Sequence, residues 1–333
     1  MDPSLYKALA GLSAPRRAQL YGLATSAGEP PAVARALRWG LLLVAGLLLA
    51  SGLIFWIAAN WQAQTRMFKL GLIEAALALS IVAACLWPRA RLAALLCAHL
   101  VLGGLLAFVG QTYQTGADAW QLFAVWAALS LIWTLLARSD LLWTLWMAVG
   151  ALGLASWQGR IDGLDWWFSR PEPLAVVLPQ MLLWLGLALV PWLVSCLPWL
   201  RSPQGLGRIS HRLGLGLSLL VWCTYGVRHW LDGGQGQVFA MACALTAGIA
   251  FVSFKGRLQD FPSLCMATLA ANALAMAAVL HLAEPQDIMG LILLCLLLGL
   301  GGLWGSVTGL MAVQRRMQVQ AQAAVKTEAE VGA

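Results

Sequence analysis

The feature that most constrains this chain is a succession of apolar blocks, each about 17 to 25 residues long. At a rise of 1.5 Å per residue, such a block forms a helix that crosses a hydrocarbon core of about 30 Å. Of the 333 residues, 61% are hydrophobic and 11% are charged, whereas a soluble domain carries about 25% charged residues. The sequence therefore predicts an all-α, polytopic transmembrane helix bundle.

We predict ten membrane spans from these blocks. The spans are 39–59, 70–87, 92–112, 119–137, 141–157, 174–197, 213–231, 238–254, 263–283 and 288–313. A helical N-terminal segment (1–38) precedes them, an outer loop (158–173) separates two sets of five, and a tail (314–333) follows. Because five is odd, duplicated halves would have opposite orientations, as in many secondary transporters, although we find no convincing sequence repeat.

The distribution of Lys and Arg predicts the orientation, because cytoplasmic loops of membrane proteins are enriched in basic residues. With the N-terminus in the cytoplasm, 16 of the 21 basic residues fall in inside segments. The remaining five, Arg66, Lys69, Arg160, Arg170 and Arg228, fall outside or near outer span ends. Both termini are therefore predicted to be cytoplasmic. The net charge of +7 indicates orientation rather than nucleic-acid binding.

A polar turn between the third and fourth spans is the densest set of hydrogen-bonding side chains between two membrane-length segments. It reads Gly110-Gln111-Thr112-Tyr113-Gln114-Thr115-Gly116-Ala117-Asp118. We expect the helix to break at Gly110 and Gly116 to adopt a positive φ. Asp118, with Gln121 three residues later, predicts a side-chain N-cap for the next helix.

The side chains of this turn have two interpretations. They bind a polar solute or ion at the outer mouth of a pathway, or they satisfy backbone groups of a tight turn at membrane depth. The candidate binding residues are Gln111, Tyr113, Gln114, Thr115 and Asp118, together with Glu74.

Glu74 lies near the outer end of the second span. It is either a cation or proton site or an interfacial carboxylate paired with Arg66 or Lys69. Arg228 and His229 lie near the outer end of the seventh span, where their side chains can snorkel toward water.

Two further polar residues lie inside predicted spans. His99 is either a proton-relay group or a hydrogen-bonded side chain between helices, with Gly103 and Gly110 on the same face permitting close approach. Asn272 is predicted to hydrogen-bond between helices.

A stripe of three glycines, Gly301, Gly305 and Gly309, marks the last span. It predicts close contact with a helix of the same bundle or, alternatively, with a second copy of the chain.

Motifs for catalysis and metal binding are absent from the sequence. The four His residues lie far apart, and there is no HExxH, GxSxG, P-loop or Rossmann pattern. The seven Cys residues fall within or beside apolar blocks without CxxC spacing, as expected for packing residues. We therefore predict no catalytic residues, no metal and no cofactor.

Several stretches carry a resemblance to a known family. They are Ala59-Asn60-Trp61, Phe68-Lys69-Leu70-Gly71-Leu72-Ile73-Glu74-Ala75-Ala76, the polar turn, Trp120-Gln121-Leu122-Phe123, Trp126 and Ala137-Arg138-Ser139. Over about residues 35–155 the chain resembles uncharacterised bacterial multi-pass membrane proteins grouped as domain of unknown function family 2157. The resemblance implies a bacterial inner (plasma) membrane location and a multi-pass topology, and it implies no reaction.

The leading hypothesis is transport or permeation of an unidentified small solute through a polar outer vestibule. It rests on the polar turn, the five-plus-five layout and the lack of enzyme motifs. One alternative is a non-transporting membrane protein that organises or regulates an envelope complex through its N-terminal segment and outer loop. Another is an intramembrane enzyme acting on a lipid-linked substrate. The expected partners are the lipid bilayer, the solute and, under the first alternative, a membrane protein; the oligomeric state is left open.

Overall fold

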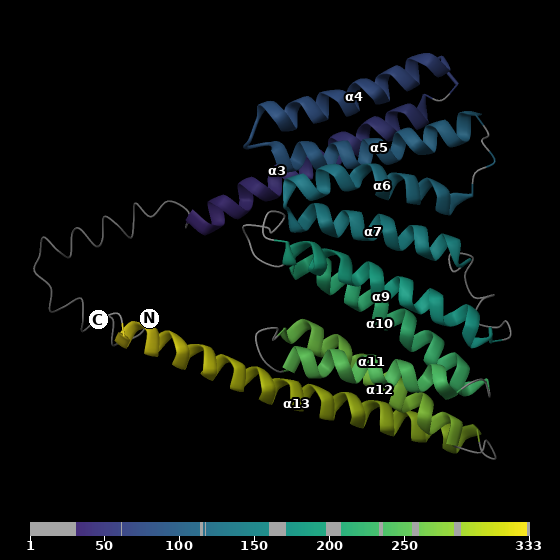
Figure 1. Ribbon diagram of the computed structural model, residues 1–333, viewed down its shortest axis with the longest axis vertical. Helices are drawn as coiled ribbons and strands as arrows, with labels where there is room; N and C mark the ends of the chain where they lie inside the picture. The colour runs from purple at the N-terminus through teal and green to yellow at the C-terminus, as the bar shows by residue number, and fades with distance from the viewer. Residues whose placement is uncertain are drawn as a thin grey trace, which may run out of the picture. The chain divides into compact units, whose positions relative to one another are not determined.

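The structure is a computed structural model. It describes residues 31–60, 62–113, 116, 118–159, 171–197, 208–232, 236–254, 260–282 and 288–331. Regular structure within these ranges is entirely α-helical (Figure 1). Most of the predicted N-terminal segment and outer loop, and the predicted site residues Gln114 and Thr115, lie outside the described residues.

Ten helices make up the described part of the chain. They are α3 (Pro31–Ala59), α4 (Arg66–Leu86), α5 (Arg91–Tyr113), α6 (Ala119–Ala137), α7 (Asp140–Trp157), α9 (Leu174–Cys196), α10 (Arg208–Leu231), α11 (Gly236–Phe254), α12 (Phe261–Leu282) and α13 (Ile288–Val331). Each of the ten predicted spans coincides with one of them. The predicted all-α polytopic bundle is confirmed.

The chain forms two compact units, Met1–Gly104 and Leu105–Ala333, which divide within α5. In the first unit α3 packs closely on α5. A Cβ atom added to Gly46 would lie 2.8 Å from the carbonyl oxygen of Ala93, and one added to Gly104 would lie 3.1 Å from the side chain of Ile54. Glycine is therefore what permits the two helices to approach so closely.

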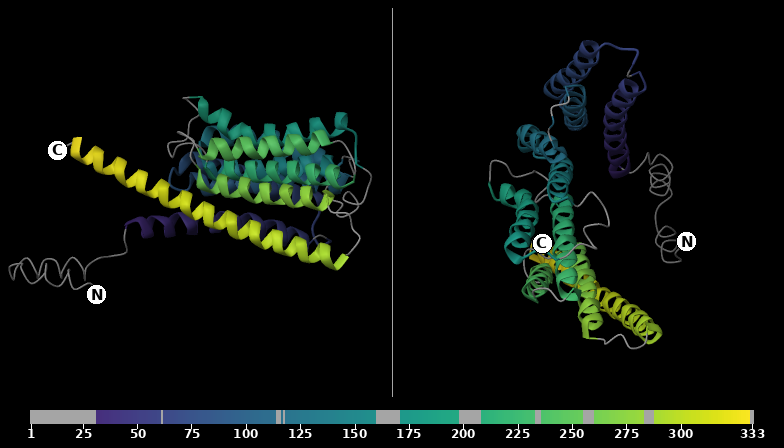
Figure 2. Two further views of the ribbon diagram at one scale, coloured as in Figure 1. Left: turned by 90° about the horizontal axis from the view of Figure 1, so that it is seen from below. Right: turned by 90° about the vertical axis from the view of Figure 1, so that its right-hand side faces the viewer.

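In the second unit α10 is the central helix. It contacts α7, α9, α11 and α12, while α6 packs on α7 and α13 packs on α12. The buried core of the unit lies around α10 and includes Met181, Trp184, Leu219, Trp222 and Ala242. α13 runs along one side of this unit and continues beyond its neighbours (Figure 2).

Nine described helices are long and apolar enough to cross a membrane, and α10 is the described helix that does not meet this criterion. Its polar residues include His211, Arg212, Arg228 and His229. It nevertheless runs antiparallel to α9 and α11, both of which qualify, and it connects the end of one to the start of the other (Figure 1). If those two helices cross the membrane, α10 crosses it as well.

The antiparallel order places the starts of α7, α10 and α12 at one end of the second unit. We call this the Asp260 end, after the residue that precedes α12. The opposite end, where α7 and α10 finish, is called the Arg228 end. Asp118, which precedes α6, lies at the Arg228 end because α6 finishes where α7 begins.

Candidate functional site

One face of α10 carries polar side chains along its whole length. His211, Ser218, Trp222, Tyr225 and His229 follow one another at intervals of seven, four, three and four residues. In a helix with 3.6 residues per turn, this spacing keeps all five within an arc of about 60°. The face turns toward α9, and we call this polar α9–α10 interface the polar seam.

Hydrogen bonds cross the polar seam from one end to the other. At the Asp260 end His211 bonds the backbone of Ala188. Farther along, the Trp222 indole Nε1 donates to the carbonyl oxygen of Met181 at 2.9 Å. The Tyr225 hydroxyl donates to Gln180 Oε1.

Backbones also approach closely in the polar seam. A Cβ added to Gly214 would lie 2.8 Å from the Cα atom of Ala188. Glycine therefore allows α9 and α10 to approach each other closely at this point.

His229 ends the polar seam between two backbone carbonyls. Its Nδ1 lies 3.0 Å from the Tyr225 oxygen, and its Nε2 lies 2.9 Å from the Glu172 oxygen. A carbonyl oxygen only accepts, so both contacts are hydrogen bonds only when the imidazole carries a proton on each nitrogen. His229 therefore links α10 to the carbonyl oxygen of Glu172, the residue that lies two positions before α9.

Arg228 lies beside His229, and its side chain is only 1% exposed. Its Nε atom is 4.0 Å from the carboxylate of Asp232, whose side chain is 46% exposed. The predicted snorkelling of Arg228 and His229 toward water is wrong, because both side chains are buried against neighbouring helices. A guanidinium inside the helix layer is costly, so it marks a candidate functional position.

Several polar side-chain atoms in or beside the polar seam are buried without a hydrogen-bond partner in the described part of the chain, among them Gln158 Nε2, Glu172 Oε2 and Ser218 Oγ. The other amide atom, Gln158 Oε1, accepts from Trp184 Nε1 at 3.0 Å. Each of these atoms could be satisfied by a bound water or polar molecule.

The residues predicted for the polar turn occupy several local structures. α5 does not break at Gly110 but continues to Tyr113, because a single glycine weakens a helix by only about 1 kcal/mol. Gln111 and Tyr113 therefore lie in its last turn, and both are exposed. Gly116 has a φ of +67°, as predicted.

Asp118 is the N-cap residue of α6, with an extended backbone at φ −65° and ψ 152°. Its side chain makes no capping hydrogen bond, so the predicted side-chain cap is wrong. The carboxylate is exposed, so water can donate hydrogen bonds to it in place of the backbone N–H groups of α6.

Two other predicted residues belong to the first unit. Glu74 is exposed on α4, and its side chain makes neither a hydrogen bond nor an ion pair with the residues that the structure describes. His99 is fully buried on α5. Close helix approach was predicted at Gly103 and Gly110, but a Cβ on Gly110 would meet no atom within 4 Å, and the observed approach is at Gly104.

Asn272 hydrogen-bonds between helices, as predicted: its Nδ2 donates to Ser306 Oγ of α13 at 2.8 Å. The glycine stripe next to it behaves differently. A Cβ on Gly301, Gly305 or Gly309 would meet no atom within 4 Å, so contact with a helix of the same bundle, our first interpretation, is wrong for the described residues.

Sequence reasoning missed most of the polar seam. Gln158, Glu172, Gln180 and Tyr225 were not singled out, because each is an ordinary polar residue near a span end or within an apolar block. The available signal was the spacing of polar residues along α10, which repeats like the buried face of a helix. No group of three or more possible metal ligands occurs in the described ranges.

Residues 11–143 match the model of a family described as a predicted membrane protein (DUF2157). The match confirms the predicted resemblance for this part of the chain, which ends just after the start of α7. The polar seam therefore lies outside the matched residues, apart from its α7 neighbours. No curated protein and no solved structure matches the chain.

Proposed function

We propose that this membrane protein binds and passes a small polar solute along the polar seam of its second unit. The observation that carries the proposal is the buried series of hydrogen-bonding side chains on α10, ending in Arg228 and His229. Ionisable groups inside membrane spans are rare because their burial is costly, and they commonly mark solute, ion or proton pathways. Apolar packing alone would hold helices together at a smaller cost.

The chemistry at the Arg228 end indicates the class of solute. Gln158 Nε2 can donate, Glu172 Oε2 can accept, and Arg228 adds a positive charge. A small solute with both acceptors and donors, such as an amino acid, fits this set better than a purely apolar molecule.

The polar turn belongs to the same proposal as the mouth of the pathway. Gln111, Tyr113 and Asp118 are exposed, and Asp118 lies at the Arg228 end. Gln114 and Thr115 complete the proposed mouth. Glu74 belongs to the other unit, so we propose it separately as a cation or proton site.

The proposal is tested by swelling of proteoliposomes in glycine, urea or glycerol, followed by light scattering. We expect vesicles with the parent chain to swell faster than empty vesicles in at least glycine. Tyr225→Phe and Trp222→Phe each remove one donor from the polar seam and should slow the swelling. Trp146→Phe is the matched control, since it removes a comparable bond from Trp146 Nε1 to the Ala127 oxygen, 2.8 Å long and outside the polar seam.

Two results would contradict this function: no swelling above that of empty vesicles with any probe, or equal swelling of Tyr225→Phe and the parent. Asp118→Asn and Glu74→Gln test the mouth and the separate Glu74 site in the same assay.

A second candidate function is a non-transporting partner in an envelope complex. It is favoured by α13, whose most apolar stretch within Ile292–Arg316 contains no fully buried residue and which carries the open glycine stripe. Under this function, swelling would be absent, and the chain would co-purify with a membrane protein through that helix.

A further inference from the structure

The start of α10 is fastened from two sides at the Asp260 end. On the α7 side, Asp140 Oδ2 accepts from the Ile209 backbone N–H at 2.7 Å. Asp140 Oδ1 accepts from the backbone N–H of Ser210 at 3.1 Å and from its hydroxyl at 2.6 Å. The carboxylate thus satisfies two N–H groups that a helix start leaves without partners, and it places a negative charge at the positive end of the helix.

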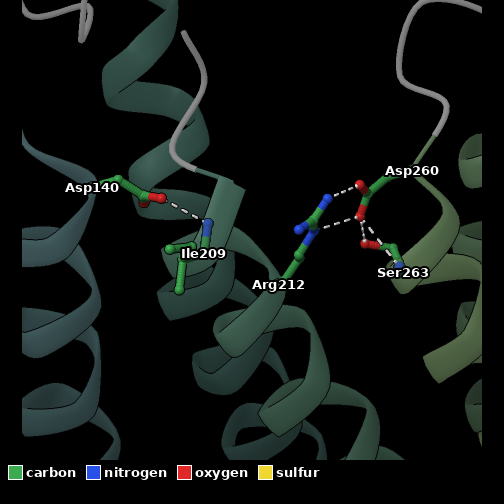
Figure 3. Close-up of polar contacts among 5 residues, drawn as sticks. All are labelled: Asp140, Ile209, Arg212, Asp260 and Ser263. Atoms are coloured by element: carbon green, nitrogen blue, oxygen red, sulfur yellow. Dashed lines mark hydrogen bonds and ion pairs between the residues drawn. The ribbon is translucent and has the colours of Figure 1, made fainter. Parts of the chain in front are cut away.

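On the α12 side, Arg212 and Asp260 form a bidentate ion pair. Arg212 Nη2 lies 2.5 Å from Asp260 Oδ1, and Arg212 Nε lies 3.1 Å from Asp260 Oδ2. Asp260 Oδ2 also accepts from the backbone N–H and the hydroxyl of Ser263. Figure 3 shows both fastenings, with Asp140 on one side of α10 and Asp260 on the other. This second fastening braces α10 against α12.

The two fastenings hold α10 against helices that lie on different sides of it. Asp140 begins α7, and α7 contacts both α9 and α10. A Cβ on Gly214, at the start of the polar seam, would lie 3.2 Å from Ala188 Cβ of α9 and 3.3 Å from Met147 of α7. α7 therefore lies over the polar seam at this end, whereas α12 lies on another side of α10.

Ser218 lies in the part of the polar seam that α7 would cover. It follows Ser210 by eight residues, which is about 12 Å along the helix. Its side chain is fully buried, and its hydroxyl has no hydrogen-bond partner among the described residues. A hydroxyl without a partner is ready to bond water or a polar solute once either reaches it.

We propose that Asp140 is a latch that holds α7 over the polar seam and closes the Asp260 end to water. When its bonds to Ile209 and Ser210 break, the start of α7 moves away and water reaches Ser218. Arg212 and Asp260 keep the start of α10 in place during this movement. The role of the latch in solute passage rests on the proposed function. The latch itself is tested separately, because water access to Ser218 is measured without any solute.

The test uses the full chain in lipid nanodiscs, where both faces are accessible, with Ser218→Cys as the reporter. The probe is a membrane-impermeant methanethiosulfonate, and peptide mapping follows each cysteine separately. Adding Asp140→Asn should raise the labelling rate at position 218 about tenfold, the change expected when a charged hydrogen bond is lost. Adding Asp260→Asn, the matched control at the same end, should leave the rate within about twofold of the reporter chain.

Ser130→Cys reports on general loosening, because Ser130 is also fully buried but lies on α6. It should stay unlabelled in every background. If Asp140→Asn does not fold, Ser210→Ala removes the hydroxyl bond to Asp140 but keeps the two backbone bonds, and it should raise labelling by a smaller factor. The latch is overturned if neither change raises labelling at position 218, or if Asp260→Asn raises it equally. If labelling at position 218 rises with Asp140→Asn but not with Asp260→Asn, while no solute makes the proteoliposomes swell, the proposed function is overturned and the latch is supported.

Discussion

α10 and α13 are the two extremes of the second unit. α10 contacts four helices and carries buried His, Arg, Tyr and Ser side chains. α13 packs on α12, and the most apolar stretch of its span Ile292–Arg316 contains no fully buried residue. The apolar α13 qualifies as a membrane span by composition, whereas the polar α10 does not.

The difference follows from what each helix faces. A helix exposed to hydrocarbon must be apolar because lipid offers no hydrogen bonds. A helix enclosed by other helices is free to carry polar groups, provided that neighbouring side chains and carbonyls satisfy them. The hydropathy of a helix therefore indicates its exposure to lipid more directly than it indicates whether the helix crosses the membrane. In the second unit, the least apolar helix is the one at the centre.

The largest expected difference between the two helices concerns their glycines. Gly214→Ala on α10 places a Cβ 2.8 Å from the Cα atom of Ala188, so a backbone must move. We expect a loss of about 1–3 kcal/mol in the free energy of unfolding, as for overpacked cores. Steric-trapping measurements in bicelles would give this value.

Gly305→Ala on α13 is the matched control, because a Cβ there would meet no atom within 4 Å. It should be neutral or stabilise the chain by up to about 1 kcal/mol through better helix propensity. A large loss for Gly305→Ala would show that α13 packs against another helix, as in a dimer.

The second-largest effect is expected from acid, which should weaken the ion pair between Arg212 and Asp260. Burial raises the pKa of Asp260, but the hydrogen bonds from Arg212 and Ser263 outweigh it and lower the pKa to about 2 from an ordinary 3.8. A depressed carboxyl pKa stabilises the fold above the unfolded value, and this stability disappears as the pH falls from about 4 to about 2. The loss should reach about 2 kcal/mol at most, measured as unfolding free energy against pH.

Asp260→Asn supplies the control for this acid effect. Since the amide does not titrate in this range, the variant should start less stable and lose less between pH 4 and pH 2. Identical pH profiles for the variant and the parent would assign the acid effect to another carboxylate.

Within the polar seam, loss of one hydrogen bond should have a moderate effect. Tyr225→Phe removes the hydroxyl that donates to Gln180 Oε1, and Tyr225 is 1% exposed. The amide oxygen then loses its donor in a buried place, which should cost about 1–2 kcal/mol. Thermal unfolding of the purified chain would detect this. A change below about 0.5 kcal/mol would indicate that water replaces the hydroxyl.

The sequence predicted the fold well because lipid imposes a strong rule on every exposed helix. Block length and composition placed all ten helices, and even the centre of the bundle was identified as a span, since most residues of α10 between Arg212 and Arg228 are apolar. The positive φ of Gly116 and the interhelical bond of Asn272 followed from residue type alone.

The candidate site was much harder to predict, because it depends on which helices are neighbours. Gln180 and Tyr225 are 45 residues apart and meet only when α9 and α10 pack together. Asp140 lies just before the predicted span 141–157 and was not singled out, because its bond to a helix start 69 residues later has no local sequence signal. Asp118 shows the reverse error, since an N-cap pattern predicted a bond that the side chain does not make.

The smallest expected effect is at the bond between α12 and α13. Asn272 is half-buried, and its Nδ2 donates both to Ser306 Oγ and to the Thr268 oxygen of its own helix. Asn272→Ala removes the bond to α13, but the Ser306 hydroxyl can turn to a carbonyl of its own helix, as Thr308 already does. We therefore expect a loss near the average of about 0.6 kcal/mol for hydrogen bonds between membrane helices, measured by the same unfolding assay as Tyr225→Phe. If Asn272→Ala lowers the free energy of unfolding as much as Tyr225→Phe does, then hydrogen bonds on the enclosed helix α10 contribute no more than those on the exposed helix α13. The contrast drawn between the two helices would then be wrong.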